Sequence, residues 1–272
     1  MEMIIRMFQY PFIQRAAVVG VLVSLCAALL GVCLVLKRYS MIGDGLSHVS
    51  FGALSLAVAL GIAPLYVSIP IVIIAAFFLL RIQENGKMKS DSAIAVVSSA
   101  SLAIGITITA LTTGMNTDVS SYMFGSILVM TKEDVVLSVA LSIVVLVLYI
   151  ICYQKIFAVT FDESFARASG VQIRIYNMLI SVLTAVTIVL GMRMMGAMLI
   201  SSLIIFPALI SMRLQKSFLG VVICAAIVSV ITFLAGLIAS FLLSTPTGAS
   251  VVIVNLIVLV IVSLIQKIRK KG

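Results

Sequence analysis

Long runs of apolar residues, separated by short polar connections, dominate the chain. A helix needs about 20 mostly apolar residues to cross a bilayer, so runs of this length predict transmembrane helices. Nine segments qualify, at residues 16–36, 41–61, 64–80, 92–112, 134–153, 175–191, 194–212, 218–243 and 249–266. The division near Arg193 has the least support, so eight helices stay open. We therefore expect an all-α, polytopic membrane protein with one permease domain over 1–272 and a membrane core over 16–266.

The basic residues between these runs predict the orientation of the helices. If the N-terminus is outside, fourteen of the eighteen Lys and Arg residues fall on the inner side: Lys37, Arg38, Arg81, Lys87, Lys89, Lys155, Arg167, Arg174, Arg213, Lys216, Lys267, Arg269, Lys270 and Lys271. Only Arg6, Arg15, Lys132 and Arg193 fall outside. Because cytoplasmic loops carry an excess of Lys and Arg, we expect an external N-terminus and a cytoplasmic C-terminus.

Two connections are long enough to hold structure of their own. The outer one, 113–133, contains the apolar stretch 122–130, which is too short to span and predicts a re-entrant or interfacial helix. The inner one, 154–174, is the most polar part of the chain. Within it Asp162, Ala166 and Gly170 recur every four residues, which places them on one helical face, and Gly170 suits a helix end. This pattern predicts a short amphipathic helix at the cytoplasmic surface.

Composition excludes several classes of function. The chain has 272 residues, of which 63% are hydrophobic and 10% charged, and its mean hydropathy is +1.32, which is typical of a membrane protein. Nine spans of about 20 residues leave no room for a nucleotide-binding, protease or DNA-binding domain. The net charge of +9 comes from residues that orient the spans, so we expect no nucleic-acid partner.

Cysteine usage and the N-terminal residues add two expected absences. The four cysteines lie in or beside apolar runs without CxxC spacing, so neither a disulfide framework nor a zinc knuckle is expected. Residues 1–15 lack the pattern of a removable signal peptide.

The predicted helix over 41–61 contains two ionisable residues, Asp44 and His48. Ionisable groups within a span are costly and indicate a functional site. A separation of four residues places them on one face, about one turn apart, with Ser47 and Ser55 on or near the same stripe. A carboxylate and an imidazole without a thiolate suit zinc, manganese or iron(II). We therefore expect the pair to contact a divalent metal ion.

Other interpretations of these features stay open. The pair could relay protons, or Asp44 could cap its helix beside Lys37 and Arg38 while His48 bonds between helices. Pro207 predicts a kink or break in the seventh helix. A methionine cluster could form a thioether copper path or simply pack: Met192, Met194, Met195 and Met198.

Five ordered motifs run through the chain. GDGLSHVSFGALSLA follows the first predicted helix, and SYMFGSIL, FDESFARASGV, MRMMGAMLISSLIIFPALIS and STPTGAS come after it in that order. Together they resemble the permease subunits of zinc and manganese ABC importers, the ABC-3 family, over about residues 16–266. The resemblance implies that Asp44 and His48 meet the transported metal. Gly45 stands where the family usually has alanine, and PALIS replaces the usual PAATA.

The resemblance also implies the partners of the chain. The inner loop is similar to the family's coupling helix, which docks on an ATPase subunit, with matches at Asp162, Glu163, Ala166 and Gly170. Such permeases pair as homodimers in a prokaryotic plasma membrane, are driven by two cytoplasmic ATPases, and receive metal from an extracellular or periplasmic binding protein. The chain itself would be no enzyme and would hold no permanent cofactor.

The transported ion is then expected to be zinc or manganese, with iron(II) as a third candidate. Two rivals stay open, namely an ABC permease for a metal chelate such as a siderophore, and a proton-coupled secondary metal transporter.

Overall fold

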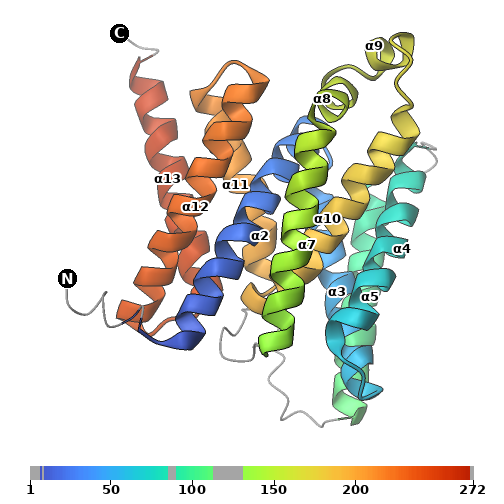
Figure 1. The fold of residues 1–272 in the computed structure, drawn as a ribbon, viewed down its shortest axis with the longest axis vertical. Helices are drawn as coiled ribbons and strands as arrows, with labels where there is room; N and C mark the ends of the chain where they lie inside the picture. The colour runs from blue at the N-terminus through green and yellow to red at the C-terminus, as the bar shows by residue number, and fades with distance from the viewer. Residues whose placement is uncertain (1–6, 8, 85–89, 113–130, 270–272) are drawn as a thin grey trace.

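The described part of the protein is a bundle of α-helices. The computed structural model describes residues 7, 9–84, 90–112 and 131–269 (Figure 1), and within these ranges all regular structure is helical. The re-entrant helix expected over 122–130 lies outside the described residues. Nine of the described helices are long and apolar enough to cross a membrane. The expected all-α, multi-pass fold with nine spans is therefore confirmed.

The spans follow the apolar runs closely. Their bounds are α2 (Pro11–Leu36), α3 (Met41–Ala59), α4 (Pro64–Glu84), α5 (Ser90–Thr112), α7 (Lys132–Ile151), α10 (Ile173–Met195), α11 (Ala197–Leu214), α12 (Phe218–Leu243) and α13 (Thr247–Arg269). The first helix begins five residues earlier than expected because Pro11 occupies its first turn, where a missing N–H costs nothing.

The sixth and seventh spans divide at Gly196, three residues beyond the expected Arg193. Gly196 has a φ of +82° between α10 and α11, a left-handed conformation that glycine adopts without strain. In contrast, α11 continues through Pro207, so the expected break there is absent. Proline removes the amide donor to the carbonyl four residues earlier. The helix nevertheless continues on both sides of Pro207, where many of its residues are buried against neighbouring helices.

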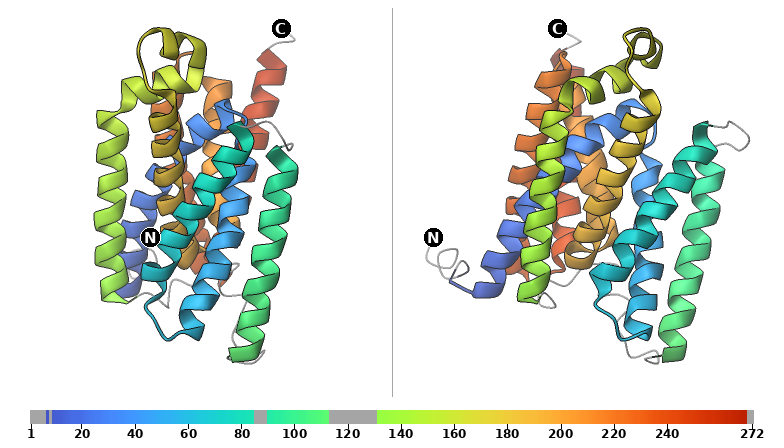
Figure 2. Two further views of the ribbon diagram at one scale, coloured as in Figure 1. Left: turned by 90° about the vertical axis from the view of Figure 1, so that its right-hand side faces the viewer. Right: turned by 45° about the vertical axis from the view of Figure 1, so that its right-hand side comes forward.

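Helix α2 lies at the centre of the bundle (Figure 1). It packs on α7, α10, α11 and α12, and α13 covers α11 and α12. Helix α3 packs on α4 and α5, and also contacts α10 and α11, so that α3, α4 and α5 form one side of the molecule (Figure 2). Helix α3, which carries Asp44 and His48, joins this side to the rest of the bundle together with α4, which packs on α10.

Helix α2 begins at one end of the bundle and α13 ends at the other (Figures 1 and 2). We call the end with the last turn of α13 and the short helices α8 (Tyr153–Phe161) and α9 (Glu163–Ala168) the coupling end, after the role that the family resemblance implies for these helices. It also holds the α2–α3 turn. The inner loop therefore forms two short helices instead of the one expected, because the chain turns at Asp162, whose backbone is extended.

Candidate metal pair and coupling segment

Asp44 and His48 lie together on α3, as their spacing predicts. The His48 Nε2 to Asp44 Oδ2 distance is 3.7 Å, and the side chains are 19% and 48% exposed, respectively. Two donors that share one ion at metal–ligand distances near 2 Å lie roughly 3 to 3.5 Å apart. A small change of side-chain rotamer would bring both atoms onto one metal ion.

The neighbours of α3 define which way this pair faces. On one flank, a Cβ added at Gly43 would contact Ile204 of α11, and the Ser47 hydroxyl lies 3.2 Å from that of Ser201 on α11. On the other flank, a Cβ at Gly45 would meet Ile94 of α5. By helical geometry, Asp44 and His48 project between these two flanks. The pair therefore faces the gap between α5 and α11, which explains why its side chains are partly exposed.

The two serines of the same stripe serve helix packing. Ser47 is fully buried and donates to the Gly43 carbonyl at 2.7 Å. Ser55 donates to the Phe51 carbonyl at 3.0 Å and accepts from Thr109 of α5 at 3.2 Å. Ser47 thus turns toward α11 and Ser55 toward α5. Ser55 lies about two turns beyond His48, so its hydroxyl packs α3 on α5 away from the pair.

The capping interpretation of Asp44 disagrees with the structure. Ser40 is the N-cap of α3, and Asp44 lies in the first turn. Of the two candidate partners, Lys37 binds Glu163 and Asn177 instead, at 2.7 and 2.6 Å. The Asp44 carboxylate lies beside His48.

The described residues hold no cluster of three or more His, Cys, Asp or Glu side chains that could bind a metal. Within the described residues, Asp44 and His48 would therefore offer two ligands to a metal ion. Among the methionines, Met192 and Met195 are buried in the hydrophobic core and Met198 is exposed. Packing of the first two fits an ordinary core role better than a thioether path.

The coupling segment, residues 153–170, is built around a buried alanine. Asp162 caps α9 by accepting from the amides of Ser164 and Phe165 at 2.8 and 3.0 Å. Ala166 is fully buried against Val159 and Val171. Gly170 follows α9 with a φ of +78°, which favours glycine. Asp162 and Gly170 thus shape the segment, and Ala166 packs α9 against α8 and against the residues that lead into α10.

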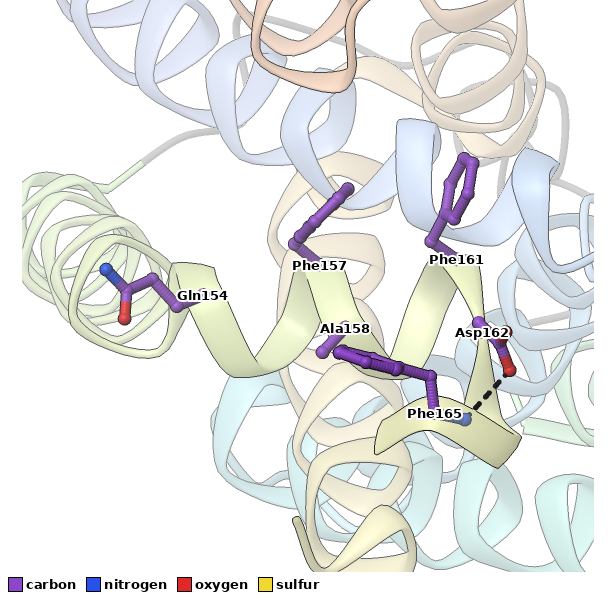
Figure 3. Close-up of a pocket in the computed structure, with 6 residues that line it drawn as sticks. All are labelled: Gln154, Phe157, Ala158, Phe161, Asp162 and Phe165. Atoms are coloured by element: carbon purple, nitrogen blue, oxygen red, sulfur yellow. Dashed lines mark hydrogen bonds between the residues drawn. The ribbon is translucent and has the colours of Figure 1, made fainter. Parts of the chain in front are cut away.

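Aromatic side chains form the outward surface of this segment. Phe157, Phe161 and Phe165 line an open hollow of about 450 Å³ together with Gln154, Ala158 and Asp162. Phe161 and Phe165 are 73% and 65% exposed. In Figure 3, Phe157 and Phe161 project to the same side of α8, and Asp162 accepts the bond from the Phe165 amide. Sequence reasoning missed these phenylalanines because their i, i+4 spacing resembles that of a core stripe.

Glu163 points toward the bundle instead of outward. Its partial burial would raise the pKa of the carboxyl, but the hydrogen bond from Lys37, the charge of Lys37 and the hydrogen bond from Asn177 outweigh burial and lower that pKa below its ordinary value of 4.5. The carboxylate is therefore ionised at neutral pH, and it ties α9 to the ends of α2 and α10.

Comparison with known protein families covers nearly the whole chain. A family model described as the ABC 3 transport family matches residues 9–266. The chain belongs to the ABC 3 transport family. The family resemblance noted from the motifs is thereby confirmed.

Relatives in this ABC 3 family match over nearly the full chain. The high-affinity zinc uptake system membrane protein ZnuB of Haemophilus influenzae is 29% identical, covering 91% of this chain and 94% of that protein. The manganese import system permease protein ScaB of Streptococcus parasanguinis is 25% identical, covering 97% and 94%. The solved structure of PsaBC from Streptococcus pneumoniae in complex with Fab is 26% identical, with a TM-score of 0.86 over 96% of this chain and 94% of that one.

Proposed function

We propose that this ABC 3 family member is the permease subunit of an ABC importer that carries zinc or manganese. The relatives named for zinc uptake and manganese import support the substrate class. The observation that carries the assignment is the Asp44–His48 pair on the open face of α3, with 3.7 Å between its donor atoms. An ion must leave a transport site again, and two ligands suit that need better than a closed set of four.

The remaining metal ligands would come from water or from a second copy of the chain. Asp44 is half-exposed in a helix that crosses the membrane, where an ionised carboxylate is costly unless it faces water or a partner. A homodimer that brings two such faces together would enclose a water-filled path. An extracellular or periplasmic binding protein would deliver the metal to its outer end.

A separate ATPase subunit would supply energy through the coupling segment. The exposed Phe161 and Phe165 rings offer an apolar surface, and aromatic anchors are frequent in protein interfaces. Asp162, Glu163, Ala166 and Gly170 would act by holding that surface in place. Closure of the ATPase dimer would then move the segment and switch the access of the metal pair.

Uptake by the permease reconstituted with its ATPase tests this function. We expect ATP-dependent uptake of zinc or manganese in the wild type and at least a tenfold loss in Asp44→Ala and His48→Ala, with the complex still assembled. Ser55→Ala is the matched control, because that hydroxyl faces α5, and it should transport normally. Full uptake by both site variants would remove the metal assignment, and uptake without the ATPase would instead favour a secondary transporter. Iron(II) and a siderophore serve as further test substrates.

A further inference from the structure

Lys37 lies at the end of α2, where that helix turns into α3. Its side chain is only 6% exposed, and its ammonium donates to Glu163 Oε1 at 2.7 Å and to Asn177 Oδ1 at 2.6 Å. The Asn177 amide donates to the same Glu163 oxygen at 3.3 Å. The ring of Tyr39 lies beneath the ammonium, with its centroid 5.9 Å from Nζ. Three elements, α2, α9 and α10, thus meet in one closed polar network.

A buried ammonium makes this network hard to separate. The Lys37 ammonium is largely buried, whereas its partner Glu163 is half-exposed, so water reaches this ammonium mainly from the Glu163 side. Because a largely buried charge is costly without its hydrogen-bond acceptors, we expect the Lys37 end of α2 to follow α9 when α9 moves. The aromatic contact between α8 and α12 is different. The ring centroids of Phe157 and Phe218 lie 4.8 Å apart with the ring planes tilted by 49°, and this contact involves no charge.

The α2–α3 turn is stiff enough to pass such a movement on. The Tyr39 amide donates to the Leu34 carbonyl at 2.7 Å and the Arg38 amide to the Val35 carbonyl at 3.1 Å. Arg38 has a φ of +61°, so the turn has the two bonds and the left-handed residue of a Schellman motif. Only residues 38–40 separate Lys37 from α3. At 1.5 Å per residue, Asp44 lies about 6 Å along the helix from Ser40 and His48 about 12 Å.

We propose that Lys37 is the positioning residue through which the coupling segment moves the metal-binding end of α3, by its bonds to Glu163 and Asn177. This inference rests on the proposed function, because it assigns a route between the ATPase-facing segment and the Asp44–His48 pair. Lys37 touches neither the metal pair nor the outward aromatic surface. Its loss should therefore separate ATP hydrolysis from transport while leaving both end sites in place.

The test is the number of metal ions transported per ATP hydrolysed by the reconstituted complex. We expect Lys37→Met and Glu163→Gln to keep ATP hydrolysis and assembly while this ratio falls at least tenfold. The exchanged pair, Lys37→Glu with Glu163→Lys, should recover much of the ratio, which a merely structural role would not predict. Lys216→Met, which removes an exposed lysine between α11 and α12, outside the coupling segment, is the charge-matched control and should retain the wild-type ratio.

A wild-type ratio in both Lys37→Met and Glu163→Gln would overturn the inference. If the Lys37→Met complex does not assemble, the ratio of metal ions transported to ATP hydrolysed in Glu163→Gln decides. The Glu163 carboxyl is half-exposed, so we expect its replacement to leave the fold intact. A wild type that takes up no metal would instead contradict the proposed function. Hydrogen exchange then tests the link alone: adding the ATPase should change exchange at residues 41–48 in the wild type but not in Glu163→Gln. Equal changes in both would overturn it.

Discussion

Two alanines of α9 show how single side chains divide the coupling segment between an inner and an outer side. Ala166 is fully buried against Val159 and Val171, whereas Ala168 is exposed. Both are small residues in one short helix, so the sequence alone does not separate their roles. The structure assigns attachment to Ala166 and the outward side to Ala168.

Leucine substitutions at these two alanines should therefore differ. Ala166→Leu overpacks the contact with α8 and should cost about 1 to 3 kcal/mol locally, which loosens α9 and weakens capture of the ATPase subunit. Ala168→Leu adds the same volume outside that contact and should unfold at the wild-type temperature. Thermal unfolding and co-purification of the ATPase measure the two effects. Equal behaviour of the two variants would contradict this view of α9.

Glu163 should make the attachment of α9 depend on acidic pH. Its pKa in the folded protein lies below 4.5, so its stabilising contribution is fully present above about pH 4.5 and is lost as pH falls through the lowered value. Because the side chain is 48% exposed, solvent screening keeps this contribution under about 1 kcal/mol. The protection of α9 amides, measured relative to the intrinsic exchange rate at each pH, should therefore fall in the wild type as pH drops below about 4.5. In Glu163→Gln, this protection should not change with pH over the same range.

Small residues at helix contacts allow pairs of helices to pack closely. On α3, a Cβ added at Gly45 would lie 2.7 Å from Ile94 Cγ2 of α5, and one added at Gly52 would lie 2.9 Å from the Ser101 carbonyl oxygen. Small residues let helix backbones approach closely in membranes. Helices α3 and α5 are therefore closely packed at both positions.

The Gly45 contact predicts the effect of an alanine at this position. Gly45→Ala gains helix propensity of up to about 1 kcal/mol but forces Ile94 to move, so we expect a net loss of stability. Ile94→Leu keeps the volume and removes Cγ2, the atom in the way. The double variant should then be more stable than Gly45→Ala alone. A thermal double-mutant cycle measures this coupling, and additive effects would show that the contact is not limiting.

A charged contact joins α7 and α10 at the opposite end of the bundle. Arg193 Nη2 lies 2.7 Å from Asp134 Oδ2, and both side chains are largely buried. Arg193→Met should cost about 3 kcal/mol, because it leaves the Asp134 charge without its partner. Adding Asp134→Asn removes that charge, so the double variant should recover part of the loss. Recovery would show in the unfolding temperature, and a double variant weaker than Arg193→Met would refute the ion pair's role.

At the scale of the whole molecule, the nine spans of the described residues run so that α2 begins at one end of the bundle and α13 ends at the other. The α3–α4 turn, with exposed Ala63, lies at one end, and the coupling segment, with exposed Ser169, lies at the other. The charge distribution predicts that the coupling end faces the cytoplasm.

Cysteine labelling in whole cells tests this orientation. A membrane-impermeant maleimide should label Ala63→Cys from outside and should label Ser169→Cys only after the cells are opened. The four native cysteines are buried or partly buried, and the parent chain without either substitution measures their background. Labelling of Ser169→Cys in intact cells would reverse the assigned topology.

The sequence by itself determined the class of fold and the proximity of the metal pair. A span needs a long apolar run wherever it lies, so all nine spans could be located from composition along the chain. Asp44 and His48 could be paired because helical geometry brings residues four apart together. Both inferences use only local rules.

Tertiary structure decided which way side chains face and which distant residues meet. Lys37 and Glu163 are 126 residues apart, and no helical period relates them. The turn at Asp162 and the helix division at Gly196 depended on local backbone geometry that several nearby residues could have supplied. Whether Ala166 or Phe165 faces outward depended on where α10 and α8 lie. These contacts follow from packing in three dimensions, which the apolar pattern of a membrane chain, hydrophobic on nearly every face, leaves undetermined.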